Sequence, residues 1–251
     1  MAETNIKIVI EYDGTDYAGW QVQDGQPTIQ GELVTAIKKT TGIEVNLIGA
    51  GRTDAGVHAL GQVANFRIDH RLEPERYRDA LNYYLQDDIR VKSSEAVDID
   101  FHSRFGASAR HYRYVVSPER SAINRNLRLH YPHKIDLSLL KEAGEAVLGT
   151  HDFAPFCVVA SRKENNECQV VFSKWRQIGP LLVYEVRANR FLHSMVRSLV
   201  GAMLNLASVE QDHNRLNLTL DSFTNIINVT TEQRVAFTAP AHGLYLVRVA
   251  Y

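Results

Sequence analysis

Short segments in which apolar and polar residues alternate recur along this chain, and segments with helical spacing separate them. Ile6–Glu11 and Gln62–Ile68 alternate as a β-strand with one buried face does. Between them, Thr28 stands at the position of a helix cap, and apolar residues follow at helical spacing up to Gly42. A chain that mixes these two patterns has to pack helices on sheets in order to bury the apolar faces of both.

The first half of the chain predicts the order strand, helix, strand, strand, helix, strand. A short apolar run, Val45–Ile48, leads into a glycine-rich stretch, and the strand that ends at Ile68 follows it. Pro74 stands where a helix through Leu85 is expected to begin, and Ile89–Val97 is the last strand of this half.

The second half predicts a similar order. Its expected elements are a strand at Ala109–Ser117, a helix at Leu137–Leu148, a hairpin of strands at Val170–Ile178 and Leu181–Ala188, helices at Phe191–Ala207 and Leu220–Ile227, and a closing strand at Leu244–Ala250. We therefore expect an α+β fold with two similarly ordered halves, residues 1–105 and 106–251. Each half is expected to be a mainly antiparallel sheet with helices on one face, as in ferredoxin-like and RRM-like folds, with a cleft between the halves.

Composition restricts the class of protein. Of the 251 residues 45% are hydrophobic, which is enough for one large core or two modest ones. The net charge of -1 does not indicate a polyanionic partner, so any basic surface has to be sought locally. Cys157 and Cys168 are the only cysteines and form no CxxC pair, which suits a reducing compartment. With no leader pattern and no run of about 18 apolar residues, a soluble cytoplasmic protein without a membrane partner is expected.

The stretch Gly49–Ala59 is rich in small residues. It begins like a dinucleotide-binding fingerprint, but Asp54 stands where the third glycine is required, and a carboxylate there repels a pyrophosphate. It also has the glycine spacing of a P-loop, but Val57 and His58 replace the residues that hold phosphate and magnesium. These substitutions argue against both kinds of nucleotide site.

What remains is a loop that presents an acid beside a base. Its small residues allow another molecule to approach the backbone closely. Arg52 near Asp54 favours the ionised carboxylate, which is then a competent nucleophile at neutral pH. The alternative is an ordinary turn in which Asp54 caps the backbone and Arg52 is solvated.

Further motifs accompany this loop in a fixed order along the chain. They are Tyr12–Gln21, Gly49–Ala59, Gly61–Val63, Ala80–Asn82, Phe101–Phe105, Ala109–Tyr114, Gly149–Phe153, Phe191–Arg197 and Gly243–Leu246. By these residues the chain resembles the TruA family of tRNA pseudouridine synthases over essentially its whole length. The resemblance implies an isomerase that converts uridine to pseudouridine in tRNA, with no cofactor. No metal is expected either, because the sequence has no zinc-type spacing, and His130 and His133 are interpreted as solvated or packing histidines.

The resemblance also implies which residues carry the reaction. Asp54 is the expected nucleophile, because it occupies the aspartate position of the family's Gly-Arg-Thr-Asp loop. The family's active-site tyrosine falls on Tyr112, although strand alternation puts Tyr114 on the same face and pattern alone does not choose between them. Arg197 matches the arginine that is thought to pair with the aspartate. It lies within an apolar helical stripe, so it requires a partner or an exit to solvent.

Other residues are expected to contact the RNA. The target uridine has to leave its stack, and Arg52 either fills the vacancy or holds a phosphate. Leu246 is a candidate apolar wall under the uracil, with core packing as its alternative. His58, Arg110 and Arg113 are the remaining candidate substrate-binding residues.

A basic segment indicates where the RNA lies. Residues 104–134 contain a single acid, Glu119, against a series of lysines and arginines (Arg104, Arg110, Arg113, Arg120, Arg125, Arg128, Lys134). Tyr112, Tyr114 and Tyr131 are interleaved with them, a mixture that suits phosphate contact and base stacking, although a solvated basic face is the alternative. We expect tRNA in the central cleft and, by the resemblance, a homodimer.

One segment departs from the family pattern, and two other functions remain open. The family commonly has an arginine before the strand at Val170, where this chain has Glu167-Cys-Gln, so the modified tRNA position can differ from the usual 38, 39 and 40 of the anticodon arm. One alternative is a non-catalytic RNA-binding protein of the same fold. The other is a hydrolase or phosphotransferase with an aspartyl intermediate, for which a second carboxylate near Asp54 is expected as a magnesium ligand.

Overall fold

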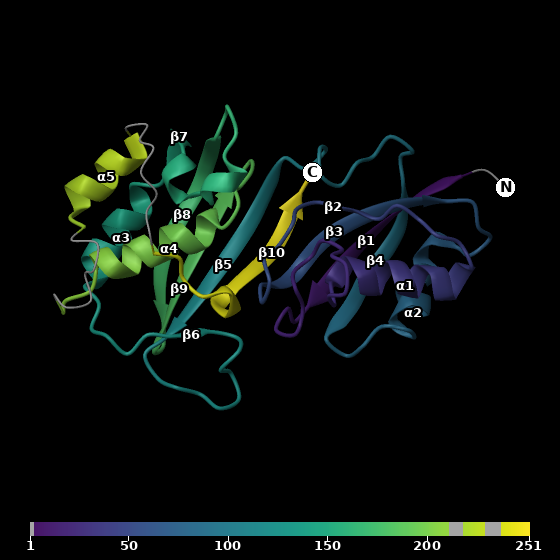
Figure 1. Cartoon of the computed structure of the whole chain (residues 1–251), viewed down its shortest axis with the longest axis horizontal. Helices are drawn as coiled ribbons and strands as arrows, with labels where there is room; N and C mark the ends of the chain where they lie inside the picture. Colours follow the sequence, from purple (N-terminus) through teal and green to yellow (C-terminus); the bar gives the residue numbers. More distant parts are fainter. Residues whose placement is uncertain (1–2, 211–217, 229–236) are drawn as a thin grey trace. The chain divides into compact units, whose positions relative to one another are not determined.

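The computed structural model describes residues 3–210, 218–228 and 237–251. The chain divides into two compact units, one formed by Met1–Ser108 with Tyr245–Tyr251 and the other by Ala109–Leu244. Each unit combines strands with helices (Figure 1), which confirms the α+β class.

The sheet of the first unit is mainly antiparallel. Its strands are β1 (Thr4–Tyr12), β2 (Ile48–Gly49), β3 (His58–Ile68), β4 (Ile89–Val97) and β10 (Leu244–Ala250). β1 is central and pairs antiparallel with both β3 and β4, while β2 pairs antiparallel with β3. β10 pairs parallel to β3, with Tyr245 opposite His58 and Leu246 opposite Ala59. The last strand of the chain therefore lies beside the strand that follows the glycine-rich loop.

Two helices cover this sheet. α1 (Ile29–Thr41) is capped by Thr28, whose side chain accepts a hydrogen bond from the backbone N–H of Gly31, and it buries Ile29, Leu33 and Ile37. The 3-10 turn η1 (Pro74–Arg76) leads into α2 (Tyr77–Asn82), which packs against α1 and β4 (Figure 1). The expected boundaries are confirmed for α1, whereas α2 ends before Leu85.

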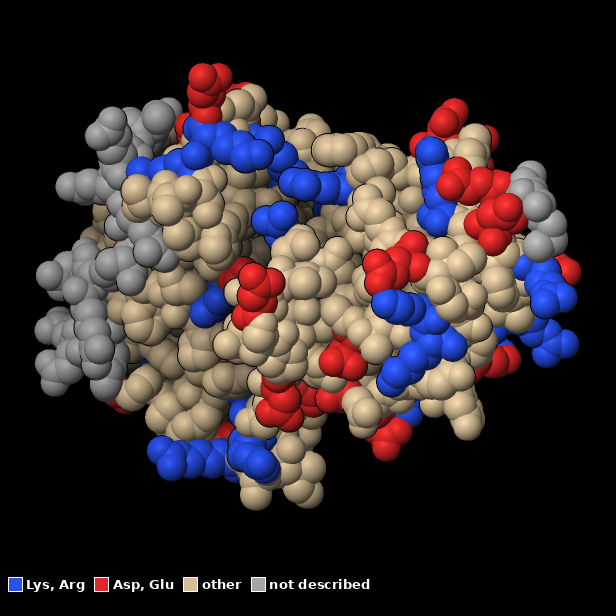
Figure 2. Space-filling view, turned by 45° about the vertical axis from the view of Figure 1, so that its right-hand side comes forward, with Lys and Arg blue, Asp and Glu red and all other residues tan. Residues whose placement is uncertain are grey.

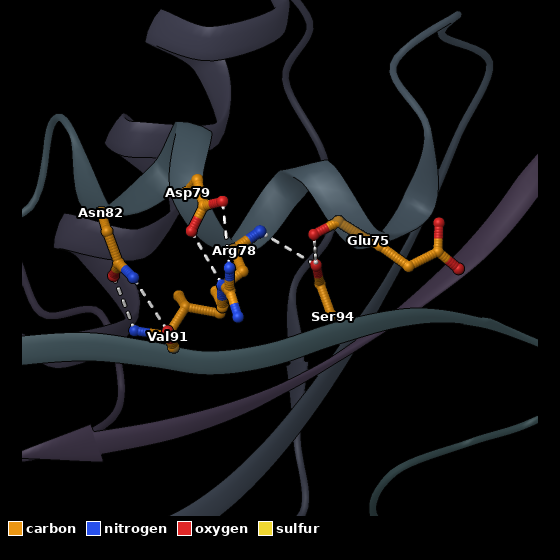
Figure 3. Close-up of polar contacts among 6 residues, drawn as sticks. All are labelled: Glu75, Arg78, Asp79, Asn82, Val91 and Ser94. Atoms are coloured by element: carbon orange, nitrogen blue, oxygen red, sulfur yellow. Dashed lines mark hydrogen bonds and ion pairs between the residues drawn. The ribbon is translucent and has the colours of Figure 1, made fainter.

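Side-chain hydrogen bonds attach α2 to the edge strand β4 (Figure 3). The Asn82 amide donates to the carbonyl of Val91 and accepts from its N–H, both at 2.8 Å. The Ser94 hydroxyl accepts from the N–H of Arg78 at 2.9 Å and donates to the carbonyl of Glu75 at 3.1 Å. Asn82 thus satisfies both backbone groups of Val91 as a neighbouring strand would.

In the part of the chain that the structure describes, the second unit contributes five further strands. Its strands are β5 (Ala109–Ser117), β6 (Leu129–His130), β7 (Gly149–Asp152), β8 (Glu167–Ile178) and β9 (Leu181–Ala188). Within it β5 pairs with β9, β9 with β8 and β8 with β7, all antiparallel, and the short β6 runs parallel to β5. The hairpin of β8 and β9 turns at Gly179 and Pro180 as expected.

Helices cover one face of the strands of the second unit (Figure 1). They are α3 (Leu137–Glu145), α4 (Met195–Leu206) and α5 (Leu220–Asn228), with short 3-10 turns η2 (Ala154–Phe156) and η3 (Val159–Ser161) and, near the end of the chain, η5 (Ala241–Gly243). α3 packs against β8, α4 and α5 (Figure 1). The Ser173 hydroxyl donates to the carbonyl of Gly144 at 2.6 Å, and the Trp175 indole approaches the sulfur of Met203 at 3.1 Å. The helices therefore cover the face of β8 that carries Ser173 and Trp175.

None of the described helices combines the length and the apolar character that a membrane span requires.

Candidate active site

The loop that carries Asp54 lies between β2 and β3, and hydrogen bonds join its first residues to β3. The Ala50 N–H donates to the carbonyl of Val63 at 2.7 Å, and the Gln62 amide donates to the carbonyl of Gly51 at 2.8 Å. The backbone then turns, with the Val57 N–H donating to the carbonyl of Asp54 at 3.2 Å. The Asp54 side chain is half-buried between the buried residues Thr53 and Val57 and the exposed Arg52 and Ala55.

A second segment, Tyr12–Gln21, packs along this loop. The Trp20 N–H donates to the carbonyl of Thr53 at 3.1 Å, and the Gly56 N–H donates to the carbonyl of Tyr17 at 3.4 Å. A buried hydrogen bond of 2.8 Å also joins the hydroxyls of Tyr12 and Thr53. Burial raises the pKa of the Tyr12 hydroxyl above its usual value, so this group stays protonated at neutral pH.

Two glycines permit this close packing. A Cβ at Gly14 would lie 2.1 Å from the carbonyl oxygen of Val57, and a Cβ at Gly19 would lie 2.6 Å from that of Thr53. Gly19 also has a φ of 102°, a conformation that residues with a side chain rarely adopt. The backbone on both sides of Asp54 is therefore held by backbone of the Tyr12–Gln21 segment.

Three other predicted site residues lie in the same unit. The Arg52 side chain is exposed, and its Nε–H donates to the Gln21 amide oxygen at 3.1 Å. The His58 ring is buried, accepts the N–H of Gly14 at 3.0 Å and stacks on Tyr245. Leu246 is fully buried on β10, opposite Ala59 at the end of the loop. His58 and Leu246 thus support the loop from the sheet, whereas Arg52 faces solvent.

The second unit separates the two tyrosines that strand alternation left equivalent. Tyr114 is fully buried, its hydroxyl donates to the carbonyl of Pro240 at 2.7 Å, and a Cβ at Gly243 would lie 2.6 Å from its ring. Burial also raises the pKa of Tyr114. Tyr112 keeps 8% of its surface exposed and meets the ring of Phe191 edge-on at 5.0 Å. Both tyrosines are therefore buried, Tyr114 completely and Tyr112 with a small exposed fraction.

Arg197 lies on α4 among the buried apolar residues of that helix. Its side chain is half-buried, and its Nε–H donates to the carbonyl of Ala239 at 2.8 Å. The N–H of Ala239 in turn donates to the carbonyl of Arg197 at 3.0 Å. The segment before η5 therefore holds one edge of this guanidinium group in place.

The comparisons with known proteins decide the family. The family model described as tRNA pseudouridine synthase matches residues 8–106 and 143–251. A relative from Acetivibrio thermocellus, named tRNA pseudouridine synthase A, is 40% identical over 249 residues, which cover 98% of this chain and 99% of the relative. Relatives of the same name from Chlorobium luteolum and Bacillus pumilus are 40% and 36% identical, again over 98% of this chain and over 95% and 98% of their own lengths.

The chain belongs to the tRNA pseudouridine synthase family. It is therefore an enzyme, an isomerase that acts on tRNA.

The predicted RNA-binding arginines of this synthase lie on β5. Arg110 donates to the carbonyl of Asn189 at 2.8 Å. Arg113 donates through Nε and Nη2 to Glu185, at 3.2 and 2.9 Å, and Arg176 donates to the same carboxylate at 3.1 Å. Because side chains alternate along a strand, Arg113 and Tyr112 project from opposite faces of the sheet. A band of lysine and arginine side chains runs along the top of the face in Figure 2, so basic groups are gathered locally although the net charge is only -1.

Sequence reasoning did not identify the residues that hold the Asp54 loop of this synthase. Tyr12, Gly14, Gly19 and Gln21 carried part of the family resemblance, but their pattern gives no contact partner. The structure assigns these residues to support of the loop. In the described part of the chain, no cluster of three or more His, Cys, Asp or Glu residues has the proximity that a metal site needs.

Proposed function

We propose that this enzyme isomerises uridine to pseudouridine in tRNA with the Asp54 carboxylate as its covalent nucleophile. The observation that carries the proposal is the loop itself. Asp54 is half-buried on a backbone that hydrogen bonds fix from the sheet and from the Tyr12–Gln21 segment. A nucleophile has to approach its target within about 3 to 3.5 Å in a defined direction, and a fixed backbone reduces the cost of that alignment.

The chemistry suits a single carboxylate. The N1–C1′ bond of uridine breaks, the uracil turns, and a C5–C1′ bond forms. The proton on C5 is lost and N1 gains one, so no atom is gained or lost overall. During this sequence an oxygen of Asp54 forms a bond either to the ribose carbon or to the uracil ring, and that bond breaks again before product release.

Residues of the second unit are proposed to take part in the same reaction. Tyr112 stacks on the target base and assists proton transfer, since it keeps a small exposed fraction whereas Tyr114 has none. Arg197 pairs with the Asp54 carboxylate and keeps it ionised. The described contact of its Nε with Ala239 directs one edge of the guanidinium and supports this role. Leu246, at the end of the loop, forms the apolar wall under the uracil.

The remaining proposals concern the RNA and the assembly. We propose positions 38, 39 and 40 of the anticodon arm as the substrate uridines, with phosphate contacts from Arg52, Arg110 and Arg113. Extrusion of the uridine costs a few kcal/mol in lost stacking, which these contacts offset. A homodimer in the cytoplasm is the proposed working form, and the free, buried Cys157 and Cys168 are compatible with a reducing compartment. The RNA-binding cleft remains a prediction.

The test uses unmodified tRNA with uridines in the anticodon arm. Wild type, Asp54→Asn and the control Asp16→Asn are incubated with it, and pseudouridine is mapped by chemical labelling and primer extension. Asp54→Asn keeps the size of the side chain and removes the nucleophile, while Asp16 is an exposed acid of the neighbouring segment. Modification by wild type and Asp16→Asn only is the expected result.

Other outcomes of this test discriminate between functions. If no protein modifies the RNA and all bind it equally, the enzyme is not active on this arm and the RNA-binding alternative is favoured. Modification by Asp54→Asn at the wild-type rate contradicts the nucleophile assignment. Turnover that a chelator abolishes favours the magnesium-dependent alternative.

A further inference from the structure

We propose that Gln21 and Gln30 are positioning residues that orient the guanidinium group of Arg52 toward the RNA. The inference rests on the proposed contact of Arg52 with the substrate. It adds two residues from outside the Asp54 loop, Gln21 from the Tyr12–Gln21 segment and Gln30 from α1.

A chain of hydrogen bonds links α1 to Arg52, and its polarity follows from its two ends. The carbonyl of Leu47 can only accept, so the Gln30 amide turns its NH₂ group toward it, at 2.9 Å. The Gln30 amide oxygen then accepts the N–H of Val22 at 3.0 Å and the NH₂ group of Gln21 at 2.7 Å. This leaves the Gln21 oxygen for Arg52, whose Nε–H can only donate and lies 3.1 Å away. Reversing the Gln30 amide would place its oxygen against the carbonyl oxygen of Leu47. Reversing the Gln21 amide would place its NH₂ group against the Nε–H of Arg52.

The start of the chain of hydrogen bonds is rigid. Gln30 lies in the first turn of α1, and its backbone N–H donates to the carbonyl of Trp20 at 3.0 Å. The neighbouring N–H of Ile29 donates to the carbonyl of Gly19 at 3.2 Å, and the Ile29 side chain is fully buried. The same segment that holds the catalytic loop therefore also holds the helix end that carries Gln30. Arg52 is therefore oriented relative to Asp54 through both the loop and this end of α1.

The hydrogen bond with Gln21 fixes the plane of the Arg52 guanidinium. Of its five N–H donors, the one on Nε is used by Gln21, and the four on the two Nη atoms lie on the other edges of the group. That geometry suits a bidentate contact with a phosphate. An exposed arginine gains little stability from one such bond, because water solvates it equally well, so we infer that the two glutamines serve orientation rather than folding.

The test is a double-mutant cycle on full-length protein with unmodified tRNA. The single variants are Gln21→Leu, Gln30→Leu and Arg52→Ala, and each glutamine change is also combined with Arg52→Ala. Leucine keeps most of the side-chain volume and removes the amide. Gln23→Leu is the matched control, because Gln23 is an exposed glutamine two residues after Gln21 whose amide donates to the carbonyl of Ala18.

We expect Gln21→Leu and Gln30→Leu each to lower kcat/KM about ten-fold, the effect of one hydrogen bond to a charged group. In the Arg52→Ala background neither should cause a further loss, since the group that they orient is absent. Gln21→Glu keeps an acceptor for Arg52 and should retain activity within about three-fold of wild type. Gln23→Leu should behave as wild type. Thermal unfolding should be similar for wild type, Gln21→Leu, Gln23→Leu and Arg52→Ala, whereas Gln30→Leu also loses its hydrogen bonds to Leu47 and Val22 and should unfold at a lower temperature.

Three results would overturn the inference. The first is that Arg52→Ala is impaired while Gln21→Leu has wild-type activity. This result removes the positioning role of Gln21 but leaves the proposed role of Arg52 intact. The second is an equal loss from Gln21→Leu in the presence and absence of Arg52, because this indicates a structural role. The third is an Arg52→Ala variant that is fully active, which removes the substrate contact itself and with it this part of the proposed function.

Discussion

The hydroxyl groups of Tyr12 and Thr53 lie 2.8 Å apart in a buried hydrogen bond that joins the end of β1 to the residue before Asp54. Both side chains are almost inaccessible to water, so neither hydroxyl can replace its partner with solvent. The bond therefore couples the position of the Asp54 loop to the central strand of the first unit.

The substitution Tyr12→Phe tests this coupling. It leaves the Thr53 hydroxyl buried without that partner, and we expect the free energy of unfolding to fall by about 1 to 2 kcal/mol. Turnover should fall about ten-fold with little change in KM, because the loop that presents Asp54 loses one of its anchors. Tyr17→Phe is the control, since the Tyr17 hydroxyl donates to Asp88 rather than to the loop. Urea unfolding and single-turnover kinetics measure the two effects, and equal turnover of both variants would contradict the coupling.

Gly19 provides a second test of loop support. In Gly19→Ala the new methyl group would lie 2.6 Å from the carbonyl oxygen of Thr53 at a φ of 102°. The loop has to shift, and we expect a loss of about a hundred-fold in kcat/KM. Gly25→Ala is the matched control, because Gly25 also has a positive φ of 70° but its Cβ meets nothing within 4 Å. It should cost about 1 kcal/mol in stability and leave kcat/KM unchanged. A Gly19→Ala enzyme of wild-type activity would show that the close packing is dispensable.

Asn82 lies in one of the family motifs, yet its contacts are structural. Asn82→Ala removes both hydrogen bonds to Val91 on the edge strand (Figure 3), and we expect the free energy of unfolding to fall by about 1 to 2 kcal/mol. The turnover of the folded enzyme should not change. Asp79→Asn, which alters only the exposed ion pair with Arg78, should have no measurable effect on stability. A loss of turnover in a stably folded Asn82→Ala enzyme would assign Asn82 a direct role in the reaction.

Local patterns predicted most elements of the fold, and the exceptions have local or long-range causes. β4, β5, β9 and β10 begin and end at the predicted residues, since alternation identifies a buried face directly. The helix expected from Phe191 begins only at Met195, because Ser194 has a left-handed φ of 59°, which interrupts the helical conformation before it. The division expected at residue 105 assigns β10 to the second half, whereas β10 pairs with β3 in the first unit. Alternation determines which face of a strand is buried, but it does not determine which other strand lies beside it.

The Asp54 loop is recognisable in the sequence as small residues around an acid beside a base. That pattern also fits an ordinary turn, so the role of Asp54 came from the family resemblance. The support of that loop is not recognisable, because Tyr12 and Thr53 are 41 residues apart in sequence. The same limit applies to Gln21 and Gln30, whose amides become informative only once their common path from Leu47 to Arg52 is known.

The two tyrosines of β5 offer the last test, since alternation treats Tyr112 and Tyr114 alike. Tyr114→Phe breaks a buried hydrogen bond to Pro240, so we expect stability to fall by about 1 kcal/mol while turnover stays at the wild-type level. Tyr112→Phe keeps the ring that stacks on the base but loses the hydroxyl proposed to move a proton, and turnover should fall by about a hundred-fold. Single-turnover assays with both folded variants separate the roles. A reversed pattern, with Tyr114→Phe inactive and Tyr112→Phe active, would assign the reaction to the buried tyrosine and require the contact with Pro240 to open during turnover.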